Sequence, residues 1–93
     1  MHDRVWIEHN IVSNGYLHLK LMLPALVTSP KKSILLDMSE QILSLKHLAP
    51  GQKGSPSEIF TTFLLIRCDA DKAKAVYSRL DNSVTILAPL LEM

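Results

Sequence analysis

An Asn14-Gly15 dipeptide separates two stretches of residues that favour β-strands. Both residues tolerate positive φ angles, so the pair is the favoured loop of a two-residue type I′ hairpin. Val5–Val12, before it, is rich in β-branched and aromatic residues, and Tyr16–Leu23, after it, carries a leucine at every second position. Because successive side chains of a strand point to opposite faces, the leucines predict one buried sheet face. We therefore predict an antiparallel hairpin at the start of the chain.

The middle of the chain predicts a break followed by a second hairpin. Pro24–Lys32 contains two prolines, which interrupt regular structure. Ser33–Leu48 fits two strands around a Ser39-Glu40 turn. A helix over Ile34–Leu48 is the competing interpretation, because the apolar residues there also suit a period of 3.6. We prefer the hairpin.

The last third of the chain predicts a loop and then a strand–helix–strand unit. Ala49–Pro56 is a loop by its glycine and proline content. Glu58–Cys68 reads as a long central strand, apolar enough in its second half to be buried on both faces. Asp69–Leu80 has an aspartate suited to a helix N-cap and an apolar stripe at helical spacing. Val84–Leu87 then predicts a short strand.

These elements predict an α+β fold. We expect a mostly antiparallel sheet of about six strands, built as two hairpins and a β-α-β unit with one main helix. The chain has 93 residues, of which 47% are hydrophobic and 20% charged, values typical of one globular domain and unlike those of disordered chains. We therefore expect a single small domain over residues 1–93. A domain of this size buries a modest share of its surface, so a partner chain would stabilise it.

Charge and cysteine content restrict the class of protein. The formal net charge is +1, and the densest basic cluster, Lys31-Lys32, is too short for a phosphate-binding stripe, so we predict no nucleic-acid partner. One cysteine, Cys68, cannot form an internal disulfide, and we predict that it packs in the core. No apolar stretch is long enough for a signal core or a membrane span. We expect a cytoplasmic protein with no membrane contact.

The stretch Ser33–Leu90 resembles the vicinal oxygen chelate superfamily, in its glyoxalase/bleomycin-resistance branch that is similar to 3-demethylubiquinone methyltransferase. Three segments carry the resemblance, each similar to a strand, turn or helix pattern of that family: Leu36–Leu43 leading to Ala49-Pro50-Gly51, Asp69–Ala73 with Val76–Leu80, and Val84–Glu92. The resemblance implies curved sheets of βαβββ modules that enclose a small-molecule site.

The chain also departs from the family pattern. Family members continue past the position of Met93 into two further strands, and the Asn14-Gly15 hairpin occupies the place of their opening strand–helix unit. We therefore expect an incomplete module that a second copy completes, as a homodimer formed through sheet edges.

Histidines are the main candidates for site chemistry. If the two-residue loop pairs Ser13 with Tyr16, His9 faces Lys20, and His9 and His18 lie diagonally on one sheet face. The candidate ligand-binding residues are His9, His18 and Glu58, with Glu40 and His47 as further members of a conceivable metal shell. We favour no metal, because Lys20 beside His9 repels a cation, and we predict no cofactor, with a divalent metal as the alternative. A solvated polar sheet face explains the same residues without any ligand.

Three functions follow from these observations. The first is a small-ligand-binding or degenerate enzyme-like domain related to the glyoxalase/bleomycin-resistance superfamily and completed by dimerisation. The second is a protein–protein interaction or oligomerisation module with no small-molecule ligand. The third is a metal-dependent glyoxalase-like enzyme, for which His9 and His18 would have to be metal ligands.

Overall fold

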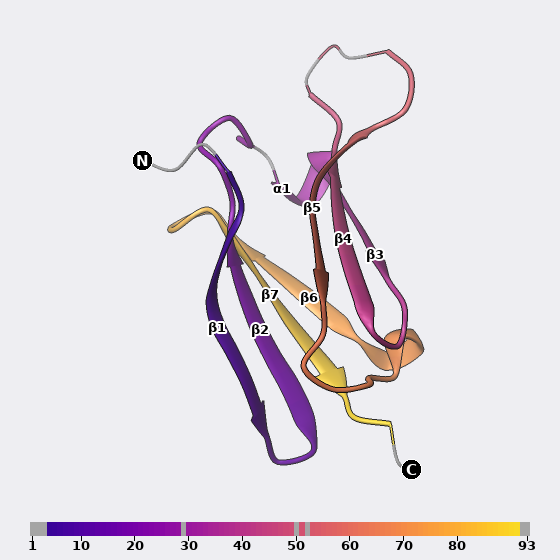
Figure 1. Ribbon diagram of the computed structural model, residues 1–93. Coiled ribbons are helices and arrows are strands. Elements are labelled where there is room, and N and C mark those ends of the chain that lie inside the picture. Colours follow the sequence, from indigo (N-terminus) through magenta and orange to yellow (C-terminus); the bar gives the residue numbers. More distant parts are fainter. Residues whose placement is uncertain (1–3, 29, 50, 52, 92–93) are drawn as a thin grey trace.

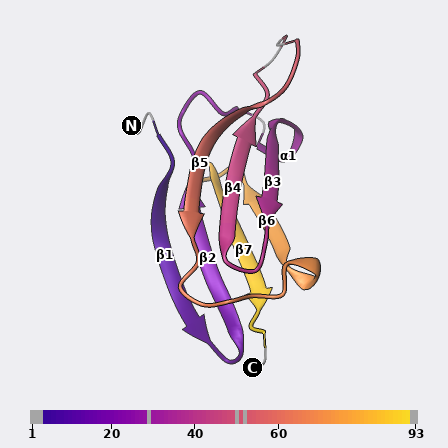
Figure 2. The ribbon, with the colours of Figure 1, turned by 45° about the vertical axis from the view of Figure 1, so that its right-hand side comes forward.

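The computed structural model describes residues 4–28, 30–49, 51 and 53–91, and in these residues seven strands form two antiparallel sheets that face each other (Figures 1 and 2). The four-stranded sheet has the order β1-β2-β7-β6, and the three-stranded sheet has the order β3-β4-β5. The chain crosses to the second sheet after β2 and returns after β5. The strands are β1 (Trp6–Ser13), β2 (Tyr16–Met22), β3 (Ile34–Met38), β4 (Ile42–His47), β5 (Ser57–Phe63), β6 (Lys74–Ser78) and β7 (Ser83–Pro89).

The first hairpin confirms the sequence prediction. Asn14 and Gly15 have φ angles of 55° and 81°, as a type I′ loop requires. Ser13 pairs with Tyr16 and His9 with Lys20, which is the expected register. A bulge in β1 between Ile7 and His9 shifts the register by one residue, and the pairing continues beyond it from Ile7 with Leu21 to Trp6 with Met22.

The core lies between the two sheets, and β2 is at its centre. The leucines at positions 17, 19, 21 and 23 are at most 5% exposed, which confirms the predicted buried face. They meet the inner faces of β7 and β4. The main apolar cluster contains Val5, Leu19, Leu21, Leu23, Val27, Ile34, Leu43, Leu45, Val84 and Ile86. A smaller cluster, Leu17, Cys68 and Ala88, continues it toward the Asn14-Gly15 end.

The second hairpin is also confirmed. β3 and β4 pair around residues 39–41, and Leu43 and Leu45 alternate with exposed or half-buried neighbours, which is the period of a strand. The competing helix over residues 34–48 is therefore wrong. The preceding break holds one helical turn, α1 (Pro30–Ser33).

The prediction for residues 58–68 is wrong in two respects. The strand β5 ends at Phe63, and it lies at the edge of the three-stranded sheet, where it pairs with β4. Leu65 and Ile66, expected to be buried on a central strand, are 65% and 39% exposed. The chain leaves the sheet after Leu64, whose N–H donates to the Gln41 carbonyl at 2.7 Å.

The predicted main helix over residues 69–80 does not form, and the α+β fold class is wrong. Asp69 does cap a helical turn, by accepting a hydrogen bond from the Asp71 N–H at 3.1 Å, but that turn is only the 3-10 helix η1 (Ala70–Lys72). The chain then continues as β6, which pairs with β7 in the four-stranded sheet. Ala75 and Tyr77 pack toward the core, whereas Val76 is 66% exposed, so strand alternation prevails over the helical stripe. The domain is nearly all sheet.

Among the residues that the structure describes, no helix has the length and apolar character needed to cross a membrane.

We predict that Gly15→Val lowers the free energy of unfolding by about 1–2 kcal/mol, because a β-branched residue is strained at positive φ. No atom lies within 4 Å of the position that a Cβ would take, so the effect comes from the backbone and not from a clash. Urea denaturation measures it. Ser13→Val, at the last residue of β1 before the loop, is the control and should change stability little. Equal losses for both variants would contradict the explanation.

Candidate functional site

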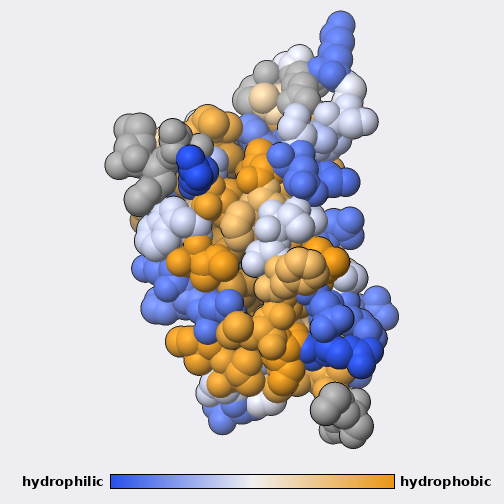
Figure 3. Space-filling view, in the orientation of Figure 1, coloured by the Kyte–Doolittle hydropathy of each residue, from blue (hydrophilic) through white to orange (hydrophobic). Residues whose placement is uncertain are grey.

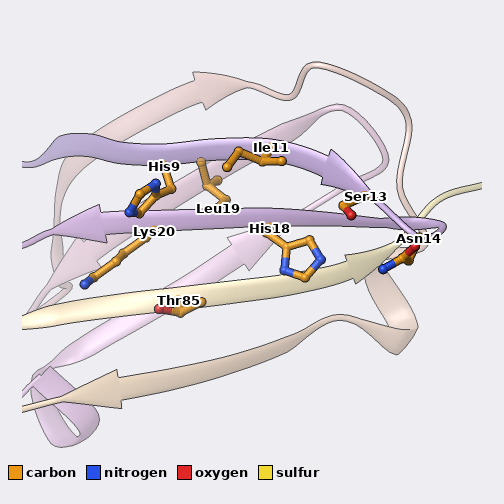
Figure 4. A pocket seen from close by; sticks show the side chains of 8 residues that line it. All are labelled: His9, Ile11, Ser13, Asn14, His18, Leu19, Lys20 and Thr85. Atoms are coloured by element: carbon orange, nitrogen blue, oxygen red, sulfur yellow. The ribbon is translucent and has the colours of Figure 1, made fainter.

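A shallow hollow of about 380 Å³ lies on the outer face of the four-stranded sheet, away from the core (Figure 4). Its lining comes from β1, β2, β7 and the first hairpin loop: His9, Ile11, Ser13, Asn14, His18, Leu19, Lys20 and Thr85. The predicted register thus brings two of the three candidate ligand-binding residues, His9 and His18, to one surface. Whether they bind a ligand stays a prediction.

The two imidazoles do not converge on a common point. In Figure 4, His9 lies beside Lys20 and the His18 ring lies further along the sheet, toward Asn14. In the described part of the chain, no three His, Cys, Asp or Glu side chains are grouped so that they could hold a metal ion. These two imidazoles therefore do not supply the converging ligands that a metal site needs.

Lys20 is held by two carboxylates at one end of the hollow. Its Nζ lies 2.8 Å from Asp81 Oδ2 and 3.3 Å from Glu8 Oε2, and the Ser83 hydroxyl donates to Asp81 Oδ1 at 2.6 Å. The hydrogen bond from Lys20 is the main reason that the pKa of Asp81 falls to about 2, with Ser83 adding to it. The same contact raises the pKa of Lys20. The ammonium is therefore already neutralised by its neighbours.

The other candidates from the sequence lie elsewhere. Glu58 is exposed on β5, in the other sheet, opposite Lys46. Glu40, in the turn after β3, forms a 2.5 Å ion pair with Arg67. His47 is 6% exposed on the inner face of β4, and its Nε2 has no hydrogen-bond partner among the described residues. None of these three lines the hollow.

Cys68 packs in the core, as predicted. Its side chain is fully buried with Leu17 and Ala88, and its thiol donates to the Ile66 carbonyl at 3.3 Å. Burial raises the pKa of the thiol, which disfavours the reactive thiolate.

A second surface, which the sequence analysis missed, is the side of the sandwich between the edge strands β1 and β5. These strands lie on the same side of the molecule in both views (Figures 1 and 2). We call this the open side. Apolar residues gather on it between β1 and the end of β5 (Figure 3). At the end of β5, Phe63 is 78% exposed and pairs with Ile42, which is 39% exposed. Because the neighbouring Leu43 faces the core, both side chains lie on the outer face of the three-stranded sheet, beside the β5 edge.

The open side also leaves part of the core-facing surface of β1 uncovered. Val12 pairs with the fully buried Leu17 and so shares its face, yet Val12 is 43% exposed. Asn10 pairs with Leu19 on the same face, and its amide oxygen is buried without a hydrogen-bond partner among the described residues. The three-stranded sheet is therefore too narrow to cover the whole inner face of the four-stranded sheet. The apolar run Phe63–Ile66 was the available signal in the sequence, but we read it as a buried strand.

Comparisons with models of protein families and with curated proteins give no match for this chain. The relationship to the vicinal oxygen chelate superfamily therefore stays a prediction from the sequence. The helix over residues 69–80, which carried one of its three segments, is absent from the fold.

We predict that Asp81→Asn lowers stability at pH 7 and removes part of the acid sensitivity of the domain. The folded-state pKa of Asp81 is depressed from 3.8 to about 2, so its contribution is present above pH 3.8 and is lost as pH falls toward 2. Urea denaturation at several pH values between 2 and 7 measures both effects. Asp37→Asn, which removes an exposed carboxylate from β3, is the control; an identical pH profile for both variants would contradict the role of Lys20.

Proposed function

We propose that this domain is a self-associating protein-interaction module that binds a second copy of itself through the open side. The observation that carries the proposal is the exposure of large apolar side chains beside a free strand edge, with Phe63 78% and Leu65 65% exposed. Grouped apolar exposure of this kind marks interaction surfaces more often than it marks ordinary solvated surface.

The incomplete cover of β1 supports the same proposal. A partner on the open side would remove Val12 from water and would reach the region of the unpaired Asn10 amide oxygen. Burying an apolar side chain of this size contributes about 1.5–3 kcal/mol, whereas a buried polar atom without a partner costs about 1–3 kcal/mol. Both terms favour association at this side over association at the polar outer face that contains the hollow.

We expect Phe63→Ser to weaken self-association by about tenfold or more, because each copy loses the large apolar side chain that is exposed beside the β5 edge. Light scattering after size-exclusion chromatography, over a series of protein concentrations, gives the mass of the assembly. Leu80→Ser is the matched control, since Leu80 is 101% exposed in the turn between β6 and β7 and its loss should leave the mass unchanged. A single-chain mass for the wild type at every concentration, or equal effects of both variants, would contradict the proposal.

Small-molecule binding in the hollow is the second candidate, in line with the sequence-based hypothesis of a ligand-binding domain. The specific observation that favours it is the joint lining by His9, His18 and Thr85, which offer hydrogen-bonding groups around an apolar floor. The hollow is shallow, and the ammonium group that lines it, on Lys20, is already paired with two carboxylates. Small-molecule binding is therefore the weaker of the two proposals.

Thermal unfolding separates the two candidates. If self-association is the function, the melting temperature rises with protein concentration and does not change with Zn²⁺, Ni²⁺, Mn²⁺ or a panel of small metabolites, because only a partner that binds the folded state stabilises it. A ligand-dependent increase that His18→Ala abolishes, without any concentration dependence, would instead support the hollow and overturn the first candidate.

A further inference from the structure

We propose that two copies join by antiparallel pairing of β5 with β5, with Thr62 of each copy at the two-fold axis. This inference rests on the proposed self-association and assigns its central element. The three-stranded sheet becomes a continuous six-stranded sheet in the dimer.

The backbone of β5 has the pattern that such pairing needs. Leu64 N–H donates to Gln41 O, and hydrogen-bonded and non-hydrogen-bonded pairs alternate along an antiparallel ladder. Thr62 and Phe60 therefore direct their backbone groups to β4, while Thr61 and Phe63 direct theirs to the free edge. The Phe63 carbonyl accepts a 3.3 Å bond from the Thr62 hydroxyl and retains a second lone pair.

Centring the pair on Thr62 uses all of these free groups. Thr61 of each copy then stands opposite Phe63 of the other, which gives two hydrogen-bonded pairs related by the axis. This register needs only the regular part of β5, because the irregularity of the strand lies at its other end, between the partners of Leu45 and Lys46. It also places each exposed Phe63 ring against a threonine, a favourable aromatic and β-branched cross-strand pair.

Charge explains why a second copy is the partner. The eight residues from 59 to 66 carry no charged side chain, so two copies of this segment approach without repulsion. Each of the other edges has a feature that discourages pairing. β1 contains a bulge next to Glu8, β3 has five residues and includes Asp37, and β6 has five residues and begins with Lys74. Of the four edge strands, β5 is therefore the one suited to pair with a second copy of itself.

Pairing of four or five residues alone is smaller than a standard interface, which buries roughly 1,600 Å². The interface must therefore extend beyond the backbone ladder. Phe63 and Ile42 lie beside the pair on the outer face of the sheet and are 78% and 39% exposed, and we infer that these side chains of each copy extend the contact across the axis.

Cysteine cross-linking tests the register on the full chain. Thr62→Cys should form a disulfide-linked dimer under mild oxidation severalfold faster than Thr61→Cys, because opposed residues of a non-hydrogen-bonded pair come within disulfide range and residues two positions apart do not. The wild type controls for Cys68, which is fully buried. Equal rates for the two variants would overturn the register.

Thr61→Pro provides a second test that does not depend on cysteine chemistry. Proline removes an N–H that points to the free edge and leaves the backbone bonds to β4 intact, and it also removes the exposed hydroxyl contact with Ser44 at 3.1 Å. We therefore expect a folded monomer whose melting temperature at low protein concentration falls only slightly. A dimeric wild type that Phe63→Ser dissociates but Thr61→Pro does not would overturn β5 pairing and leave the proposed self-association standing. A wild type that is monomeric throughout would overturn both.

Discussion

The contact between the leucines of β2 and those of β4 holds the two sheets together. Leu19 and Leu21 from one sheet and Leu43 and Leu45 from the other are almost completely buried in one cluster. Each such side chain contributes about 1.5–3 kcal/mol on burial, so this layer supplies a large part of a stability that is small in total. The outer face of the four-stranded sheet, where Lys20 joins two carboxylates, contributes through solvent-screened charges and is secondary. The positions of β1, β5 and the hollow all follow from this central packing.

Local signals predicted the parts of the fold that local geometry determines. The Asn14-Gly15 loop set the register of the first hairpin, and from that register the shared face of His9 and His18 followed without knowledge of the rest of the chain. Alternation in β2 and β4 identified their buried faces. The strands of each hairpin contact residues that are close in sequence, and their alternating side-chain pattern favours the same strand conformation as their intrinsic backbone preference.

Non-local pairing decided the parts that the sequence analysis missed. The run after Phe60 is apolar enough for a central strand, but β5 is at an edge because the next strand, β6, pairs with β7 in the other sheet. The residues of the run do not indicate which strands will be its neighbours. The apolar residues in 73–80 fit both a helical stripe and a strand alternation. The strand forms because this segment pairs with the edge of β7. Glu58, placed with the histidines by its chemistry alone, lies in the other sheet. The open side could not be inferred at all, because it depends on which edges end up together.

The buried thiol of Cys68 gives the domain an internal reporter of its own opening. It belongs to the small cluster with Leu17 and Ala88, next to the isolated bridge between Cys68 and Leu90, and a thiol reagent reaches it only after that cluster separates. The rate of its modification therefore follows the free energy of opening at this end of the sandwich, in the way that amide exchange follows local unfolding. Dynamics near the hairpin end and the carboxyl-terminal end of β7 can thus be followed in the unaltered chain.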